Sequence, residues 1–184
     1  MPPFGFSRGS GPRLSPAEIA QRKAAIEERY GPWTAHNARL ADSVWTVKEG
    51  VANFDEKTRR ALQIAHDFFG RDLAGLRVLD LGAGEGGLSL EFAQQGAEVV
   101  CVEVREANIE KARFVAQILG IRNIAFVCDD VRNLGTQKRE FDLVLCYGLL
   151  YHLDAAAVFG LLGEMHRLAA RVAVIDTHFG LAAE

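Results

Sequence analysis

The sequence predicts an α/β fold: a doubly wound, mostly parallel sheet with an N-terminal helical cover. Three observations support this prediction. From residue 76 onward, short apolar runs alternate with helical segments. The first of these runs, in RVLDLGAGEGG, ends in an acid and is followed by a glycine-rich turn. A later run, FDLVLCYG, is continuously apolar, which is typical of a strand buried on both faces of a parallel sheet.

The length and composition fit one globular domain with its own core, since 49% of the 184 residues are hydrophobic. The net charge of -3 includes a slightly basic N-terminal third, which is too weak a signal to predict a nucleic-acid partner. No apolar run approaches the length of a membrane span, and the N-terminus lacks the apolar core of a signal peptide. We therefore expect no membrane partner.

The three cysteines, Cys101, Cys128 and Cys146, all lie in apolar, strand-like runs. They form no C-x-x-C pair and have no metal-ligand spacing. This pattern predicts buried, reduced thiols, no metal site and a cytoplasmic location.

The N-terminal part is expected to cover the sheet. Residues 1–14 are rich in Pro, Gly and Ser and are predicted to be a mobile arm. Ser15 and Pro16 then open a helix that stops before Gly31, and a second helix runs from Asp55 to residue 69, with Asp55 as its N-cap. We divide the remaining chain into a cover, residues 15–70, and a core, residues 71–184.

The core is predicted to alternate strands with helices. The expected strands span residues 76–81, 98–104, 123–128, 141–148 and 171–177, and the expected helices span residues 88–95, 106–119 and 155–168. Residues 131–140 are too few and too polar for a full crossover helix, so a loop with at most two turns is expected there.

The glycine-rich turn carries the first functional signal. Gly82, Gly84 and Gly86 let the backbone turn sharply and approach a ligand closely. Asp80 ends the strand before the turn, and Glu103 ends the next strand along the chain. Ligands of such sheets bind at the carboxyl ends of the strands. Two carboxylates there suit a ligand with an amine at one end and a ribose at the other.

An alternative is a dinucleotide site, because Gly82, Gly84 and Gly87 also match G-x-G-x-x-G. A dinucleotide loop must hold a pyrophosphate, and Asp80 would oppose that phosphate. S-adenosylmethionine (SAM) has no phosphate and carries an ammonium that Asp80 could bind. The carboxylate therefore favours SAM over NAD.

DLGAGEG resembles motif I of the class I SAM-dependent methyltransferases, and two later stretches resemble further motifs of that family. FVCDDVRNL resembles the motif with an acid facing the adenine amino group, here Asp130 or, one residue out of register, Asp129. FDLVLCYGLLYHL resembles motif IV. The resemblance implies SAM as the cofactor. The residues implied to bind it are Asp80, Gly82, Ala83, Gly84, Gly86, Glu103, Val104, Asp129, Asp130, Val131, Cys146 and Tyr147.

The segment of residues 31–50 contains Trp33, His36 and Trp45. It resembles the N-terminal cover of a subgroup that includes tRNA wobble-uridine carboxymethyltransferases and small-molecule methyltransferases. The resemblance implies that this segment lies over the cofactor, and aromatic side chains with polar atoms suit the wall or lid of a pocket on the substrate side. The alternative is that the tryptophans only fasten the N-terminal arm to the sheet. For His36, a surface or hydrogen-bonding role is expected rather than catalysis.

His152 follows the fourth strand of the core and is the candidate general base, because imidazole titrates near neutrality. The alternative is that its ring only holds the loop by hydrogen bonds. Tyr151 is assigned to the substrate side. A tyrosine in the corresponding L-Y-H position helps to bind carboxy-SAM in the carboxymethyltransferase subgroup, and this stays a minor option.

The function predicted is in-line methyl transfer from SAM to a small-molecule acceptor. The alternatives are a tRNA wobble-uridine (carboxy)methyltransferase and a cofactor-binding domain without catalysis. The family sheet normally ends in an antiparallel hairpin, which the sequence lacks after its fifth strand. Either the sequence is part of a longer chain, or a second copy pairs with that edge as a homodimer.

Overall fold

The structure is a computed structural model that describes residues 14–47, 55–134 and 141–178. Apart from Leu14, the predicted N-terminal arm lies outside the described residues. The elements follow one another as α1 (Pro16–Tyr30), β1 (Arg39–Ala41), β2 (Val44–Trp45), α2 (Asp55–Phe69), β3 (Arg77–Leu81), α3 (Gly87–Gln94), β4 (Glu98–Glu103), α4 (Glu106–Leu119), β5 (Ile124–Cys128), β6 (Phe141–Tyr147), α5 (Ala155–Leu168) and β7 (Ala169–Asp176). Two 3₁₀ helices span Val131–Asn133 and Leu150–His152.

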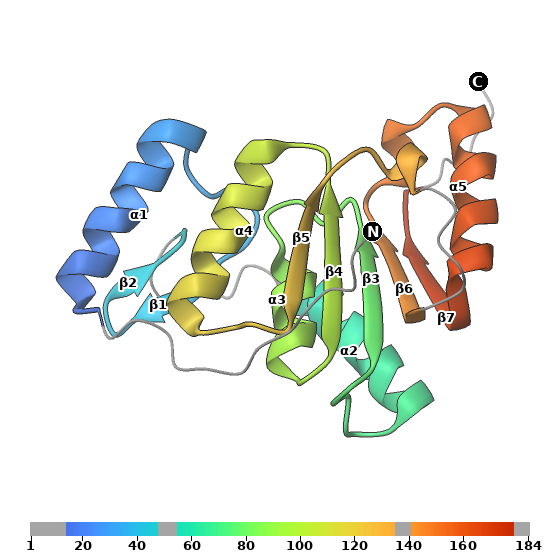
Figure 1. The fold of residues 1–184 in the computed structure, drawn as a ribbon, viewed down its shortest axis with the longest axis horizontal. Coiled ribbons are helices and arrows are strands. Elements are labelled where there is room, and N and C mark those ends of the chain that lie inside the picture. Colours follow the sequence, from blue (N-terminus) through green and yellow to red (C-terminus); the bar gives the residue numbers. More distant parts are fainter. Residues whose placement is uncertain (1–13, 48–54, 135–140, 179–184) are drawn as a thin grey trace.

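Five parallel strands form the main sheet in the order β5-β4-β3-β6-β7 (Figure 1). The chain moves outward from β3 to β5, then returns to the other side of β3 and continues to β7. The strand order therefore reverses between β3 and β6, and ligands of such sheets bind at this switch point. The prediction of a doubly wound parallel sheet is confirmed.

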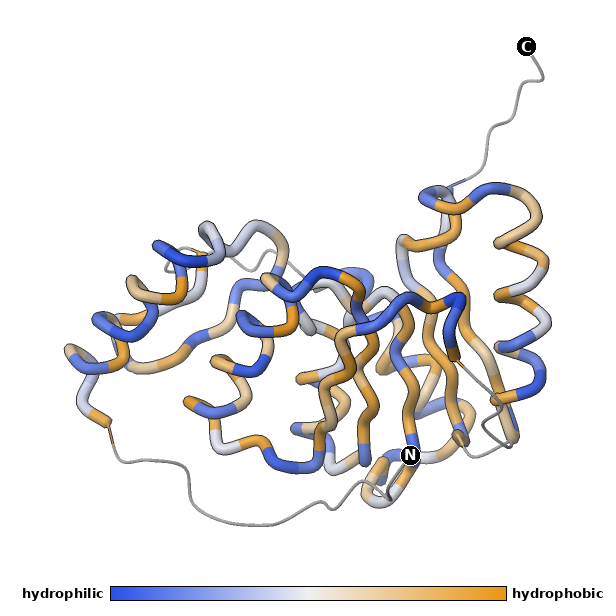
Figure 2. The backbone as a smooth tube through the Cα atoms, turned by 45° about the horizontal axis from the view of Figure 1, so that its top comes forward, coloured by the Kyte–Doolittle hydropathy of each residue, from blue (hydrophilic) through white to orange (hydrophobic). Residues whose placement is uncertain are grey.

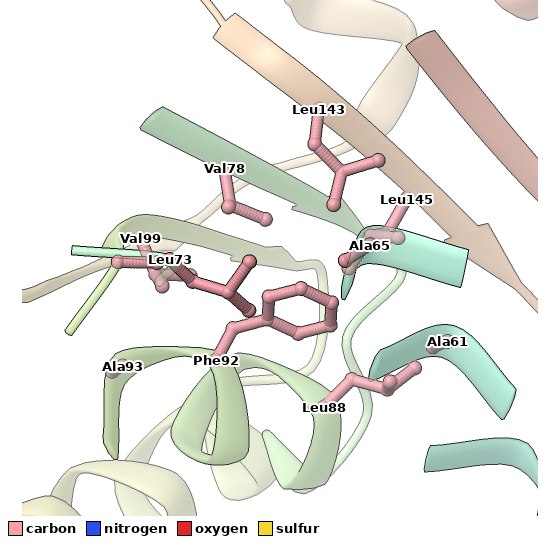
Figure 3. Packing of buried hydrophobic residues seen from close by; sticks show 11 residues of the cluster. Ala61, Ala65, Leu73, Val78, Leu88, Phe92, Ala93, Val99, Leu143 and Leu145 are labelled. Atoms are coloured by element: carbon pink, nitrogen blue, oxygen red, sulfur yellow. The ribbon is translucent and has the colours of Figure 1, made fainter. Parts of the chain in front are cut away.

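Helices cover both faces of the sheet because side chains alternate along its strands. On one face, Phe92 of α3 lies among side chains of β3, β4 and β6 (Figure 3). α2 adds Ala61 and Ala65 to this cluster. On the other face, Leu161 and Met165 of α5 pack in a second core cluster with the strand residues that point away from the first. These are Leu79, Leu81, Val100, Val102, Val144 and Cys146. The strands are accordingly the most continuously hydrophobic part of the chain (Figure 2).

The first part of the N-terminal cover, residues 15–45, packs on α4 at the β5 side of the sheet, apart from α2 (Figure 1). α1 begins with a capping box, in which the Ser15 side chain accepts from the Glu18 N–H and Glu18 reaches back to the Ser15 N–H. Ile19 of α1, Trp33 and Leu40 are buried with Phe114 of α4. The predicted helix over residues 16–30 is confirmed.

The structure adds a hairpin that the sequence pattern did not predict. β1 and β2 pair antiparallel and are three and two residues long. Strands this short carry too few residues to establish an alternating pattern. The expected loop after β5 contains the single 3₁₀ turn at residues 131–133, and its later part lies outside the described residues.

The outer edge of β7 pairs with no strand among the described residues. The homodimer expected through this edge stays a prediction. Across the described ranges, no helix has the length and apolar character that a membrane crossing requires.

Phe92→Ala is predicted to lower the free energy of unfolding by about 3–5 kcal/mol, because it leaves a cavity in the first core cluster. Phe92 is fully buried. Phe159→Ala on α5 is the matched control, since Phe159 is 75% exposed. Its expected change is within about 0.5 kcal/mol. Chemical denaturation of both variants measures the difference, and equal effects would contradict the packing described above.

Candidate functional site

The glycine-rich loop joins β3 to α3 and is held tightly against β4. The N–H groups of Gly82 and Ala83 both donate to the Val102 carbonyl, at 2.9 and 3.0 Å. Gly82 and Gly86 have φ values of +69° and +80°. A Cβ on Gly86 would lie 2.6 Å from the Ala112 Cβ of α4, so only glycine fits this turn.

Glu103, at the end of β4, connects the loop to the next strand. Its Oε2 accepts a hydrogen bond from the Gly84 N–H at 2.8 Å. Its Oε1 accepts from the Arg105 N–H at 3.0 Å and lies 3.3 Å from the Arg105 Nε. The side chain is nearly buried, and these contacts fix where its carboxylate lies.

A cavity of about 350 Å³ opens beside the loop at the carboxyl ends of the strands. That volume lies within the range of small-molecule sites. The residues lining it are Gly82, Glu103, Val104, Arg105, Asp130, Val131, Arg132, Gly148, Leu149, His152 and Leu153. The cavity thus brings together parts of the three motif stretches and the end of β4, and its lining includes two acids, Glu103 and Asp130, beside apolar side chains.

Asp80 does not line this cavity. Its side chain is 1% exposed, and its Oδ2 accepts a hydrogen bond from the Ser89 Oγ of α3 at 2.7 Å. Burial raises the pKa of Asp80 to about 6; the Ser89 bond opposes that rise, and the nearby Glu103 charge adds to it. A carboxylate in this position is electrostatically unsatisfied, so a cation beside it would be stabilised.

The two acids after β5 have different surroundings. Asp130 lines the cavity, caps the 3₁₀ helix through the Arg132 N–H and pairs with the Arg132 guanidinium. Hydrogen bonds from Arg132 lower the pKa of Asp130 to about 2. Asp129 lies outside the cavity lining, and its Oδ1 accepts from the Asp130 N–H and the Asn133 amide. Of the two alternatives, Asp130 is the one placed beside the cavity.

Several residues predicted to bind the cofactor lie near the cavity without lining it. They are Ala83, Gly84 and Gly86 of the loop, and Cys146 and Tyr147 of β6. The Cys146 thiol is buried in the second core cluster, and burial raises its pKa to about 12. The adjoining Gly148 and Leu149 line the cavity in place of the two β6 residues.

The lid residues predicted in the N-terminal segment, Trp33, His36 and Trp45, do not line the cavity. Trp33 is 3% exposed, and its ring centroid lies 5.8 Å from that of Phe114. His36 is also buried, and this burial lowers its pKa to about 4. Of the two roles expected for His36, the surface position is therefore wrong, and the hydrogen-bonding role stays a prediction. Trp45 belongs to β2. For Trp33, the structure favours the packing alternative.

His152 lies on the 3₁₀ helix after β6, is exposed and lines the cavity. Its ring centroid is 4.4 Å from that of Tyr151. The Tyr151 ring in turn stacks on His178, with centroids 4.8 Å apart and planes at 12°. Tyr151 does not line the cavity and is 47% exposed. The three rings form an aromatic rim, of which His152 lines the cavity.

Sequence reasoning missed two kinds of residue. Arg105 and Arg132 line the cavity and pair with the acids two positions before them. The i, i+2 spacing of acid and arginine after two successive strands was a readable signal. Glu85 lies among the glycines of the loop, and its long-range contacts leave no local signal in the sequence. It is a buried acid that contacts the N-terminal cover.

Known proteins resemble this chain over its core. Ubiquinone biosynthesis O-methyltransferase of Neisseria meningitidis is 36% identical over 90 residues, which cover 47% of this chain and 38% of that protein. The protein of that name from Coxiella burnetii is 37% identical over 81 residues, or 44% and 34% of the two chains. The chain therefore spans little more than a third of the length of these curated relatives.

A solved structure resembles almost the whole chain. The N-terminal domain of EvdMO1, crystallised in the presence of S-adenosylhomocysteine (SAH) and D-fucose, has a TM-score of 0.67 and 32% identity, covering 92% of this chain and 66% of that one. The family model described as a methyltransferase domain matches residues 78–171, more than half of the chain. The chain therefore belongs to the methyltransferase domain family, the class I SAM-dependent methyltransferases.

Proposed function

We propose that this chain is the SAM-binding, methyl-transferring domain of a small-molecule methyltransferase. The observation that carries the proposal is the cavity between the glycine-rich loop, Glu103 and the β6 loop, at the switch point of the sheet. The family membership supports SAM as the cofactor. The net charge of -3 gives no support to the tRNA alternative.

The cavity fits the adenosine end of the cofactor. Glu103 offers a carboxylate to the two ribose hydroxyls, in a position fixed by the Gly84 N–H. Val104, 60% exposed although hydrophobic, offers an apolar surface to a flat ring, together with Leu149. Asp130 also lines the cavity and could accept a hydrogen bond from an amino group while it remains paired with Arg132.

Asp80 is proposed to hold the ammonium of the methionine end. Its buried carboxylate lies on the strand that leads into the loop, next to the β4 strand that carries Glu103. An ammonium beside Asp80 would supply the positive charge that its buried carboxylate lacks. Binding would then lower the pKa of Asp80 and release its proton below about pH 6.

When bound, SAM supplies a methyl group on a positively charged sulfur. The chain's own task is to hold the acceptor in line with that group and to exclude water. His152 is placed at the cavity to accept a proton from an acceptor hydroxyl as the new carbon–oxygen bond forms. The aromatic rim of Tyr151, His152 and His178 offers the acceptor a surface to lie against.

A hydroxyl is the acceptor group we propose. The relatives that match the core are named O-methyltransferases, and the EvdMO1 domain was crystallised in the presence of D-fucose, which carries hydroxyls. Both observations point to a hydroxyl-bearing small molecule, and a hydroxyl gains from a general base such as His152.

Asp80→Asn is predicted to stabilise the protein and weaken ligand binding at once. The raised pKa means that the folded state holds the proton more tightly than the unfolded chain. The contribution of Asp80 to stability is therefore largest below about pH 4 and is lost as the pH rises through about 6. The amide can still accept the Ser89 bond but carries no charge. The free energy of unfolding should rise by up to about 3 kcal/mol at pH 7.5 and change little at pH 4.

The affinity of this variant for SAH should fall, because the ammonium loses its charged partner. Denaturation at the two pH values and calorimetric titration with SAH measure both effects. An SAH affinity equal to that of the wild type would contradict the assignment of Asp80.

His152→Gln is predicted to lower kcat by about 10²–10⁴ while the dissociation constant for SAH stays unchanged. The assay follows labelled methyl transfer from SAM to a panel of hydroxyl compounds that includes D-fucose. His166→Gln is the matched control, since His166 is exposed in the last turn of α5 and lies outside the cavity lining. Equal turnover of the His152 variant and the control would leave His152 with a structural role only.

A further inference from the structure

We infer that Glu85 and Lys111 are positioning residues that couple the N-terminal cover to the cofactor loop, so that docking of residues 32–36 and binding of the cofactor strengthen each other. This inference rests on the proposed function only for the identity of the ligand. Its basis is a buried ion pair that lies outside the cavity lining and that methyl transfer does not use.

The Glu85 carboxylate is enclosed by backbone donors of the cover. The N–H groups of Thr34, Ala35 and His36 donate to it at 3.0, 2.9 and 3.0 Å. Three successive amides converging on one carboxylate form an anion-binding concavity. Burial alone would raise the pKa of Glu85, but these amides and Lys111 together hold the pKa below its usual value.

Lys111 of α4 completes the arrangement. Its Nζ lies 3.2 Å from the Glu85 Oε1 and donates to the Pro32 carbonyl at 2.7 Å. The exposed fractions of the Lys111 and Glu85 side chains are 6% and 4%. The same ammonium lies 5.9 Å from the centroid of the Trp33 ring. One cation of α4 thus contacts both the loop and the cover. Removal of the charge of Glu85 or of Lys111 would leave the other charge buried without its partner.

The residues on either side of Glu85 connect it to the proposed ligand site and to α4. Gly84, directly before Glu85, donates its N–H to Glu103, the residue proposed to bind the ribose. Gly86, directly after it, packs against Ala112, the neighbour of Lys111. A shift of the Glu85 backbone would therefore move the Gly84 N–H away from Glu103. The cover and the ribose carboxylate are coupled through the short segment of residues 84–86.

The coupling runs both ways, since it is a free energy shared by two events. A bound ligand that holds Glu103 and the loop in place also holds Glu85 in the position that residues 34–36 require. Conversely, an undocked cover leaves the loop less well ordered, and the ligand must then order it on binding. The cover can thus influence cofactor affinity without touching the cofactor.

Glu85→Gln tests this coupling, because it keeps the size of the side chain and removes its charge. Calorimetric titration should show SAH binding weakened by at least about fivefold. Lys23→Met is the matched control: Lys23 also lies 5.9 Å from the Trp33 ring and pairs with Glu27 of α1, but these contacts do not reach the loop. This control should bind SAH within twofold of the wild type. Wild-type affinity in a folded Glu85→Gln protein would overturn the inference.

Amide hydrogen exchange of the wild-type chain provides a test that needs no variant. Saturating SAH should slow exchange of the amides of residues 34–36, relative to the Val158 amide of α5, by at least about fivefold. These amides donate to Glu85 and not to the cavity. Equal slowing at residues 34–36 and in α5 would overturn the inference.

Failure of the proposed function gives a different result. If the wild-type chain binds neither SAM nor SAH, the proposed function is wrong, and the coupling is then judged without ligand. Glu85→Gln should speed exchange at residues 34–36 and also at Gly84, while Lys23→Met should leave Gly84 unchanged. Unchanged exchange at Gly84 in Glu85→Gln would overturn the coupling.

Discussion

The hydrogen bond from the Gly84 N–H to the Glu103 carboxylate is the contact on which the site depends. It joins the turn after β3 to the end of β4 and therefore fixes the glycine-rich loop relative to the sheet. The parallel register makes this possible: Asp80 pairs with Cys101, and Glu103 pairs with Cys128 at the end of β5. Backbone pairing thus brings Asp80 of β3, Glu103 of β4 and Asp130, which follows β5, to one edge of the sheet. Glu103 and Asp130 line the cavity there, whereas Asp80 is buried outside its lining.

The site retains buried charges that an apolar core would avoid. Asp80, Glu85, Glu103 and Lys111 are all buried. Burial of a charge is unfavourable unless a partner or hydrogen bonds offset it. Glu85 and Glu103 have such partners in backbone amides, whereas Asp80 has a raised pKa. Buried acids with perturbed pKa values at the carboxyl edge of a sheet are the physical mark of a functional site.

Much of this fold was predictable because its signals are local and repeated. Capped helices, continuous apolar strands and the glycine turn each follow from residues close together in the sequence, and residues 106–119 form a helix with the predicted bounds. The hairpin at residues 39–45 was missed because its strands are too short to show a period. Long-range contacts were missed for another reason: Glu85 and Thr34 are 51 positions apart.

The difference between local sequence signals and long-range packing also explains which parts of the site were predicted. Gly82, Glu103, Val104, Asp130 and Val131 were expected to bind the cofactor and His152 to act as the general base, and all six line the cavity. The motif residues Cys146 and Tyr147 do not line the cavity, because they are the last two residues of β6 and belong to the sheet. The cavity lining begins with the loop that follows them. Trp33 looked like a pocket wall from composition alone, but packing against α4 decides its position.

Thermal unfolding in the presence of SAM, SAH or NAD tests the central claim most directly, because it asks which ligand the folded chain binds. A ligand at a hundred times its dissociation constant adds about 2.7 kcal/mol to the free energy of unfolding. For a domain of this size, that stabilisation corresponds to a rise in Tm of roughly 5–10 °C. The account predicts this rise with SAM and with SAH, and none with NAD. A rise with NAD alone would contradict it, because the site would then accept the pyrophosphate that Asp80 is argued to exclude.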